Sequence, residues 1–286
     1  MTAPRTKLTI GQCGTLACLL EVNAPKPGNV HRGADFLDCT LNDFSASAVA
    51  IGPILDAQLS LGQTVEQCID ATQVVAGSNT NLGIVLLLAP LALVPRDRPI
   101  EDHVEKVIAD SSRDDAQRIY QAIRKASAGG LELKPEEASD WDVNVAVPDH
   151  ILDGMQEAAD RDLIASQYAN GFQEVTNCVV PLLSSENSAS IVERIIFTHL
   201  TMMRDFPDSL IQRKCGAEVA AESAGRAAAV IDAGEVGSDA YVQALTDLDF
   251  WLRSDGHRRN PGTTADMIAA GLFVCLRDGL IQPPFR

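Results

Sequence analysis

Apolar residues recur every three or four positions along almost the whole chain, which is the spacing of one face of an α-helix. No pair of segments shows the alternation of apolar and polar residues that is typical of β-strands. We therefore predict an all-α fold, a single compact domain of about ten helices over residues 1–286. The clearest helical segments are Leu41–Leu55, Leu82–Leu93, Ser209–Ala233, Ser238–Ser254 and Thr264–Asp278.

Two segments differ from the amphipathic pattern. The apolar run Leu82–Val94 has 13 residues and contains Pro90, so it is too short to span a bilayer and is typical of a buried helix. The stretch Gly129–Val147 has mixed signals and two carboxylate-rich turns. It is the least helical part of the chain and the best candidate for a loop or lid.

The composition limits the class of partner. The chain has 286 residues, a hydrophobic content of 46% and a formal net charge of −16. The hydrophobic content is enough for a sizeable core, whereas the negative charge argues against nucleic acid or an anionic membrane as the main partner. Seven cysteines are scattered without a CxxC pair. Together with the lack of a secretory signal, they predict reduced thiols in a soluble, cytoplasmic protein.

The stretch Glu21–Asp38 concentrates charged side chains in a constrained loop. It gathers one lysine, one arginine, one histidine and three carboxylates around two prolines and two glycines. Lys26 and Arg32 suit phosphate oxygens, while Asp35 and Asp38 suit a hard cation such as Mg²⁺. The alternative is a rigid turn that carries surface charges. The order of the charges, cations first and carboxylates after, favours nucleotide chemistry.

Two further loops precede apolar helices. Gly77–Gly83 is rich in serine, asparagine and threonine, and Arg258–Asp266 combines two arginines with a Pro-Gly bend. Both could hold a phosphate or a ribose hydroxyl at a helix N-terminus. Helix capping explains much of the same pattern, because Thr263 and Asp266 have the spacing of a capping box.

One more loop, Arg204–Gly216, also joins two helical patterns; it is the third of the four loops in chain order, and Arg258–Asp266 is the fourth. Asp208 or Ser209 can cap the helix that follows. Arg213 and Lys214 come about one turn later, inside an otherwise apolar segment. A phosphate clamp and an exposed basic pair are about equally compatible with this spacing. The chain has no HExxH pair, GxSxG elbow, P-loop or Rossmann fingerprint, so phosphate binding would have to come from helix starts and side-chain cations.

Together the four loops resemble those of the triphosphoribosyl-dephospho-CoA synthase family, and the resemblance runs from Glu21 to about Leu280. The matching residues are Glu21, Pro25–Gly28, Asp35, Asp38, Asn79, Thr80, Gly83, Asp208, Arg213, Gly216, Pro261, Gly262, Ala265 and Asp266. The resemblance implies an all-helical fold. It also implies a reaction between ATP and 3′-dephospho-CoA that gives 2′-(5″-triphosphoribosyl)-3′-dephospho-CoA and releases adenine.

This resemblance and the charge pattern define the candidate site. We expect Glu21, Asp35 and Asp38 to be catalytic, and Mg²⁺ to be held by Asp35, Asp38 and Asp208. The expected nucleotide-binding and phosphate-binding residues are Lys26, Gly28, Arg32, Asn79, Thr80, Arg213, Lys214 and Asp266. The expected partners are ATP as substrate and dephospho-CoA or another cofactor precursor. The alanine-rich stretch Ala217–Ala233 could serve a homodimer interface as readily as a core.

The chain departs from the bacterial pattern in two places. It has Asn79-Thr80-Asn81-Leu82-Gly83 where bacterial enzymes usually have Asn-Thr-His-Lys-Gly, and Gln167–Phe172 replaces a Gly-Ala-Arg-Gly-Glu-Ala motif. The chain is more similar to a divergent branch with archaeal-type members. Two alternatives follow: a related transferase that acts on a pterin-type cofactor precursor, and a non-catalytic nucleotide-binding or scaffold protein whose loops only cap helices.

Overall fold

The computed structural model describes residues 7–126, 147–185 and 190–285, and it confirms the all-α prediction. Fourteen α-helices and one short π-helix lie in these ranges, more than the ten or so predicted. Within the same ranges, the β-type pairing is a single isolated bridge between His31 and Ala34. The first helices are α1 Ile10–Asn23, α2 Leu41–Leu55, α3 Leu61–Val75, α4 Leu82–Leu93, α5 Val104–Ala109, α6 Arg113–Lys125 and α7 Ile151–Ala158. The others are α8 Leu163–Asn170, η2 Val175–Val179, α9 Val180–Ser184, α10 Ile191–Asp205, α11 Ser209–Cys215, α12 Ala217–Asp232, α13 Asp239–Arg253 and α14 Gly262–Asp278.

Glycines in the left-handed region explain part of the difference in helix count. The predicted helix Ser209–Ala233 is divided into α11 and α12 at Gly216, whose φ is 94°. A similar break lies at Gly171, the C-cap of α8, whose φ is 72°. Glycine adopts these angles without the steric cost that other residues bear. The candidate lid Gly129–Val147 lies, apart from Val147, outside the described residues.

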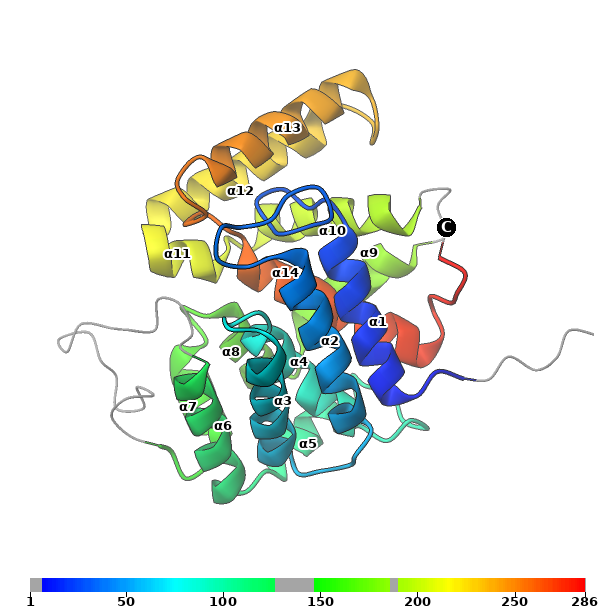
Figure 1. Ribbon diagram of the computed structural model, residues 1–286, viewed down its shortest axis with the longest axis vertical. Helices are drawn as coiled ribbons and strands as arrows, with labels where there is room; N and C mark the ends of the chain where they lie inside the picture. Colours follow the sequence, from blue (N-terminus) through cyan, green and yellow to red (C-terminus); the bar gives the residue numbers. More distant parts are fainter. Residues whose placement is uncertain (1–6, 127–146, 186–189, 286) are drawn as a thin grey trace, which may run out of the picture.

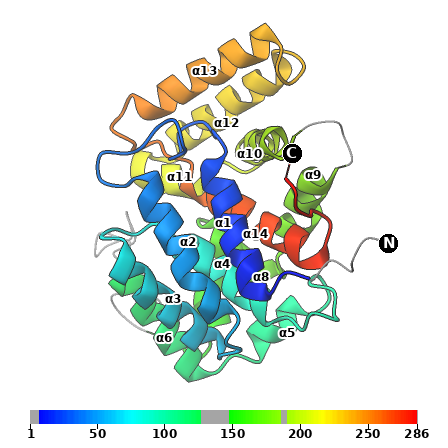
Figure 2. The same ribbon diagram turned by 45° about the vertical axis from the view of Figure 1, so that its right-hand side comes forward.

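Helix α14 is the central element of the main core. All residues from Thr263 to Arg277 except Asp266 are buried, and the helix contacts α1, α4, α9 and α10 (Figures 1 and 2). Burial on all sides explains why its sequence is apolar all round rather than on one stripe. The apolar helix α4 packs against it and is likewise buried along nearly its whole length. Within the described residues, no helix is both long and apolar enough to cross a membrane.

A second, smaller apolar cluster lies under α12 and α13. These two helices form a pair at one end of the molecule, far from α3 and α6 at the other end (Figures 1 and 2). Residues of α10 and α11, including Leu200 and Ile211, pack against Ala227, Leu248 and Leu252. The smaller cluster therefore connects α13, which precedes the fourth loop, to the helices that flank the third loop.

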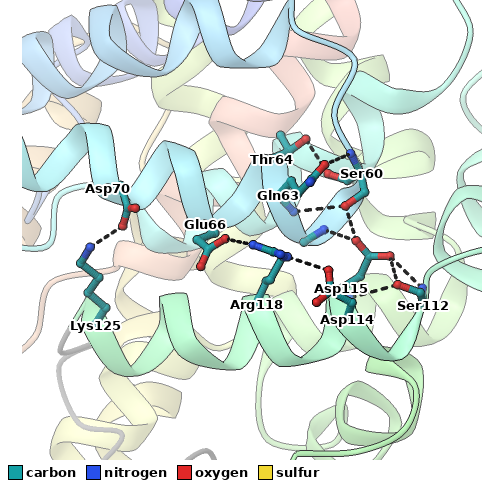
Figure 3. Close-up of polar contacts among 11 residues, drawn as sticks. Ser60, Gln63, Thr64, Glu66, Asp70, Ser112, Asp114, Asp115, Arg118 and Lys125 are labelled. Atoms are coloured by element: carbon teal, nitrogen blue, oxygen red, sulfur yellow. Dashed lines mark hydrogen bonds and ion pairs between the residues drawn. The ribbon is translucent and has the colours of Figure 1, made fainter.

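A polar seam joins α3 to α6 (Figure 3). The Asp115 carboxylate accepts hydrogen bonds from Ser60 Oγ at 2.5 Å, Gly62 N at 2.8 Å and Ser112 N at 2.8 Å, so one side chain caps the N-termini of both helices. Burial opposes ionisation of Asp115, but these hydrogen bonds outweigh it and lower its pKa. Arg118 extends the seam through an ion pair with Glu66 at 2.5 Å.

Helices α1 and α2 cross at two glycines. A Cβ atom at Gly11 would lie 2.1 Å from the backbone oxygen of Gly52, and one at Gly52 would lie 2.5 Å from Thr15 Oγ1. Only glycine allows so close an approach of two backbones. Because α1 carries Glu21 in its last turn, this crossing helps to fix the first motif relative to the core.

The crossing can be tested with two Gly→Ala substitutions. We expect Gly11→Ala to lower the Tm measured by circular dichroism, because the two helices must separate to admit a methyl group. Gly225→Ala in α12 is the matched control, since an added Cβ there meets no atom within 4 Å. Alanine is favoured over glycine inside a helix by about 1 kcal/mol, so the control should raise the Tm. Equal changes in the two variants would contradict the close approach as the cause.

Candidate active site

A cleft of about 610 Å³, including its open mouth, lies where α1, α4, α11 and α14 meet. Each of the four loops singled out in the sequence contributes to its lining. The lining residues are Glu21, Val22, Asn29, Val30, Phe36, Phe44, Asn79, Thr80, Asn81, Leu82, Gly83, Ile84, Leu210, Asn260, Gly262, Ala265 and Asp266. Four of the expected site residues, Glu21, Asn79, Thr80 and Asp266, are thus brought together.

Lys26 is fully buried and forms an ion pair with Glu21. Its ammonium lies 2.8 Å from Glu21 Oε1 and also donates to the backbone oxygens of Glu21 and Ala24. An ammonium has three donors, and all three are used here. Lys26 therefore holds the Glu21 side chain in place, and its ammonium has no hydrogen left to donate to a phosphate oxygen.

A buried histidine lies close to the ion pair. His199 of α10 is fully buried, and burial followed by the positive charge of Lys26 holds its pKa well below the usual range. Both effects favour the neutral form of the imidazole. His199 was not among the site residues predicted from the sequence.

The first loop is connected directly to the fourth. Gly28 has a φ of 76°, and a Cβ there would lie 2.9 Å from Leu252 and 2.9 Å from Pro261, so only glycine fits. Its N–H donates to Asp249 Oδ1 at 2.8 Å. Gly28 was predicted to bind phosphate, whereas the structure shows it packed between α13 and the start of α14.

Asp208 connects the third loop to the fourth. Its carboxylate accepts hydrogen bonds from the backbone N–H groups of Leu210 and Ile211 at the start of α11. It also accepts from Thr264 N at 2.7 Å and Thr264 Oγ1 at 2.8 Å at the start of α14. Of the two residues that could cap this helix, Asp208 and Ser209, the structure shows Asp208 as the N-cap of α11.

The expected capping box between Thr263 and Asp266 is wrong. Helix α14 begins at Gly262, two residues earlier than a Thr263 cap requires, and its N-cap residue Pro261 offers no side-chain acceptor. Asp208, the N-cap residue of α11, accepts the hydrogen bond from Thr264 N and so caps α14 as well. As a consequence, the Asp266 side chain is left available to the cleft.

Asp266 lies half-buried in the cleft among other carboxylates. Burial raises its pKa well above the usual range, and the negative charges of Glu21, Asp208 and Asp162 act in the same direction, against a smaller opposing effect of Arg213. A Cβ at Gly83 would lie 2.0 Å from Asp266 Oδ2, so the second loop closes directly on this side chain. The cleft therefore holds one carboxylate paired with a cation and one carboxyl group that retains its proton more readily.

The expected residues of the second loop have structural hydrogen bonds. Asn79 is exposed, and its Oδ1 accepts from Leu82 N at 3.0 Å at the start of α4. Thr80 is buried and donates to Ser47 Oγ at 2.7 Å on α2. Capping thus accounts for the Asn79 oxygen, and Asn79 also lines the cleft.

The expected phosphate-binding cations differ in availability. Arg213 forms an ion pair with Asp162 at 2.7 Å, so its charge is already neutralised. Lys214 is half-buried; burial and the neighbouring Arg213 lower its pKa, and it has no ion pair within the described residues. Arg32 is exposed and, in the same ranges, has no acidic partner either. Lys214 follows the cleft residue Leu210 by one helical turn.

Comparison with known proteins decides the family. The family model of ATP:dephospho-CoA triphosphoribosyl transferase matches residues 7–284. The chain belongs to this transferase family. A crystal structure from Archaeoglobus fulgidus, described as a triphosphoribosyl-dephospho-CoA synthase, is 22% identical to the transferase, with a TM-score of 0.63. The matched region covers 82% of this chain and 99% of the archaeal chain, which shows that the two share a fold. No curated protein sequence matches the chain.

The carboxylates expected to hold Mg²⁺ in the transferase do not form one set. Asp35 and Asp38 are exposed on the first loop, whereas Asp208 is buried and occupied by helix capping. Asp35 Oδ1 also accepts from Leu41 N at 2.7 Å. No group of three or more His, Cys, Asp or Glu side chains in the described ranges could hold a metal alone. The donors fit a Mg²⁺ ion that arrives with a triphosphate, which needs only one or two protein carboxylates.

Three asparagines and the aromatic ring of Phe36 line the cleft but were not among the expected site residues. Asn29, Asn81 and Asn260 line the cleft, and Phe36 lines it while stacking on His257 with ring centroids 4.1 Å apart. Each lies within or beside a predicted motif, so proximity to those motifs was the available signal. Asparagine is so common in turns that its presence alone does not indicate binding.

The Lys26–Glu21 pair gives a test of positioning against direct phosphate binding. We expect Lys26→Met to reduce the free energy of unfolding by about 3–5 kcal/mol, because it leaves a buried carboxylate without its partner. Adding Glu21→Gln should recover part of this loss in urea unfolding. The control Lys106→Met removes an exposed ion pair with Asp110 and should cost less than about 1 kcal/mol. An unchanged stability for Lys26→Met would show that the ammonium is not a buried partner of Glu21.

Proposed function

We propose that the cleft is where the transferase carries out triphosphoribosyl transfer from ATP to dephospho-CoA, with Glu21 and Asp266 as the reacting carboxyl groups. The observation that carries this proposal is the meeting of two carboxyl groups in different electrostatic surroundings within one cleft. Enzymes that need an acid and a base at the same pH commonly separate two carboxyl groups in this way.

The reaction substitutes one group at C1′ of the ATP ribose. The 2′-oxygen of dephospho-CoA forms a bond to C1′, and the C1′–N9 bond to adenine breaks with its electron pair going to the base. The 2′-hydroxyl proton must leave, and the departing adenine must take up a proton. The transition state resembles an oxocarbenium ion, so nearby negative charge stabilises it.

Glu21 is suited to the negative role. Lys26 holds Oε1 at 2.8 Å, which orients the carboxylate and leaves Oε2 without a hydrogen-bond partner among the described residues. This oxygen can accept the proton of the attacking 2′-hydroxyl or stabilise the positive charge that develops at C1′. The ion pair keeps the group fixed, so little reorganisation is needed during the reaction.

Asp266 is suited to the acid role. Its raised pKa keeps the carboxyl group protonated further toward neutral pH than an ordinary aspartate. A protonated carboxyl in a cleft can donate its proton to adenine as the C1′–N9 bond breaks. Its position against Gly83 places it beside the N-terminus of α4.

The triphosphate would lie toward the mouth of the cleft. Arg32 and Lys214 are the expected phosphate-binding cations that keep free donors, and Arg32 lies between the cleft residues Val30 and Phe36 in sequence. A Mg²⁺ ion bound to the triphosphate would neutralise its charge and take Asp38 or the free oxygen of Asp35 as a ligand.

The acceptor leaves room for a second candidate. The Asn81-Leu82 pair, which stands where bacterial enzymes usually have His-Lys, lines the cleft and offers no cation. A pterin-type cofactor precursor would need less positive charge there than the diphosphate of dephospho-CoA. A non-catalytic nucleotide-binding protein is the remaining alternative. The cytoplasmic location and the homodimer stay predictions from the sequence.

Adenine release is the direct test of this function. Purified protein is incubated with ATP, Mg²⁺ and dephospho-CoA, and free adenine and the triphosphoribosyl product are measured by liquid chromatography and mass spectrometry. We expect equal amounts of the two products. Release of adenine only with a pterin precursor would favour the second candidate, and no release with any acceptor would favour the non-catalytic alternative.

The two carboxyl groups should give distinct pH profiles. We expect Glu21→Gln and Asp266→Asn each to lower kcat by about 10²- to 10⁴-fold, the usual contribution of a general acid or base. In the wild type, kcat/KM should fall as the pH rises through the pKa of Asp266, because the acid loses its proton. Residual activity of Asp266→Asn should lack this fall. An unchanged alkaline limb would assign the acid to another group.

The raised pKa of Asp266 also affects stability. Between the ordinary carboxyl pKa and the raised value, the folded state holds a proton that the unfolded state has lost, so the stability of the wild type falls as the pH rises. Asp266→Asn removes this contribution, although Asp208, whose pKa is also raised, keeps its own. We therefore expect the variant to be more stable than the wild type above neutral pH in urea titrations. A less stable variant would mean that the carboxylate has a structural role.

A further inference from the structure

One wall of the cleft contains a hydrogen-bonded pair of side-chain amides. Asn29, from the first loop, donates through Nδ2 to Asn260 Oδ1 at 2.7 Å, from the fourth loop. Both residues line the cleft, and Asn29 is only 6% exposed. The pair is outside the set of residues expected from the family motifs.

The polarity of this amide pair is fixed by a backbone group. Asn29 Nδ2 also faces the carbonyl oxygen of Pro261 at 3.5 Å. A carbonyl only accepts hydrogen bonds, so this side of the Asn29 amide must be its NH₂ group. Asn260 must then turn its oxygen toward Asn29 and its NH₂ group away. The orientation of both amides therefore follows from one contact.

The fixed polarity leaves one acceptor and one donor unused. Asn29 Oδ1 is buried and has no hydrogen-bond partner. Asn260 Nδ2 makes no hydrogen bond within the described residues, and Asn260 is only partly buried. A buried carbonyl oxygen without a partner is energetically unfavourable, so such groups are commonly completed by a ligand or water.

We propose that the Asn29–Asn260 amide pair recognises an adenine base, with Asn29 Oδ1 accepting from the 6-amino group and Asn260 Nδ2 donating to the neighbouring ring nitrogen N1. Adenine presents this donor next to an acceptor, and a carboxamide donor–acceptor pattern is its usual complement. Asn29 Oδ1 is enclosed in the free protein, so contact with the base requires the Asn29 amide to turn toward the cleft on binding. Hypoxanthine carries an oxygen at position 6 and a hydrogen at N1, so it presents the reverse pattern.

This inference rests on the proposed function, because both substrates of that reaction contain adenine. The base could belong to ATP, in which case the amide pair holds the leaving group beside Asp266. It could instead belong to dephospho-CoA, in which case it orients the attacking 2′-hydroxyl. The hydrogen-bonding chemistry is the same, and separate base analogues distinguish the two sources.

The first experiment measures base selectivity of the wild type. Turnover is compared for ATP and ITP with dephospho-CoA, and then for dephospho-CoA and its hypoxanthine analogue with ATP. We expect one of the two exchanges to lower kcat/KM by about 10- to 100-fold, the loss that follows when one or two buried hydrogen bonds are not made. The exchange that causes the loss identifies the substrate whose base is held. Equal kcat/KM values in both exchanges would overturn the proposal.

The second experiment reverses the outward group of the pair. Asn260→Asp keeps an oxygen for Asn29 Nδ2 to donate to, but it replaces the outward NH₂ group by an acceptor. We expect the preference for adenine over hypoxanthine to fall by at least about tenfold, because the N1–H of hypoxanthine now finds an acceptor. The added charge acts equally on both analogues, so it cancels in the ratio.

Asn23→Asp is the matched control for this variant. Asn23 is exposed at the end of α1 and its amide donates to Leu19 O, so the same substitution adds the same charge outside the cleft. It should leave the ratio unchanged. An unchanged ratio in Asn260→Asp, with folding verified by circular dichroism, would overturn the role of the pair.

Equilibrium dialysis separates this proposal from the proposed function. ATP, ITP, dephospho-CoA and its hypoxanthine analogue are measured without turnover. If no adenine is released in the activity assay but one adenine compound binds at least about tenfold more tightly than its hypoxanthine analogue, the transferase proposal fails and the amide pair stands. If adenine is released normally, but affinity and kcat/KM are equal for the adenine and hypoxanthine compounds, the amide-pair proposal fails and the transferase proposal stands.

Discussion

The buried ion pair between Lys26 and Glu21 is the interaction on which the candidate site depends. An ammonium can remain in an apolar interior only when its charge and its three hydrogens are all compensated, and here one carboxylate and two backbone oxygens do so. The same contacts tie the end of α1 to the loop that follows it. The proposed catalytic role of Glu21 and the folding of this loop therefore depend on the same contacts, and a substitution of Lys26 or Glu21 would affect both.

Carboxylates at helix starts provide the second constraint. Asp115 caps α3 and α6, and Asp208 caps α11 and α14, so in both cases one side chain satisfies the free N–H groups of two helices. Such sharing fixes the distance and angle between the helices more strictly than two separate caps would. Because Asp208 caps α14, Asp266 is not needed as a capping residue, and its carboxyl group with the raised pKa lines the cleft.

Much of the architecture could be predicted from the sequence, because helical periodicity is a local pattern, although the break at Gly216 and the true start of α14 were not predicted. The buried helix α4 and the all-α class follow directly from such patterns. The functions of charged residues were harder to predict, because they depend on contacts between distant segments. Lys26 and Arg32 have similar motif positions, yet one is enclosed and the other exposed. Likewise, nothing local indicates that Asn29 meets Asn260, more than two hundred positions away.

Helix α14 performs two tasks along its length. Its first turns border the cleft, and the remainder is enclosed by other helices. Each residue advances an α-helix by about 100°, so a single insertion before Asp266 would swing that carboxyl toward the packed interior and misalign the apolar side chains behind it. Side chains at the rim of the cleft can therefore be exchanged without disturbing the core, whereas an insertion or deletion in the enclosed part of α14 would disturb the core and the cleft together.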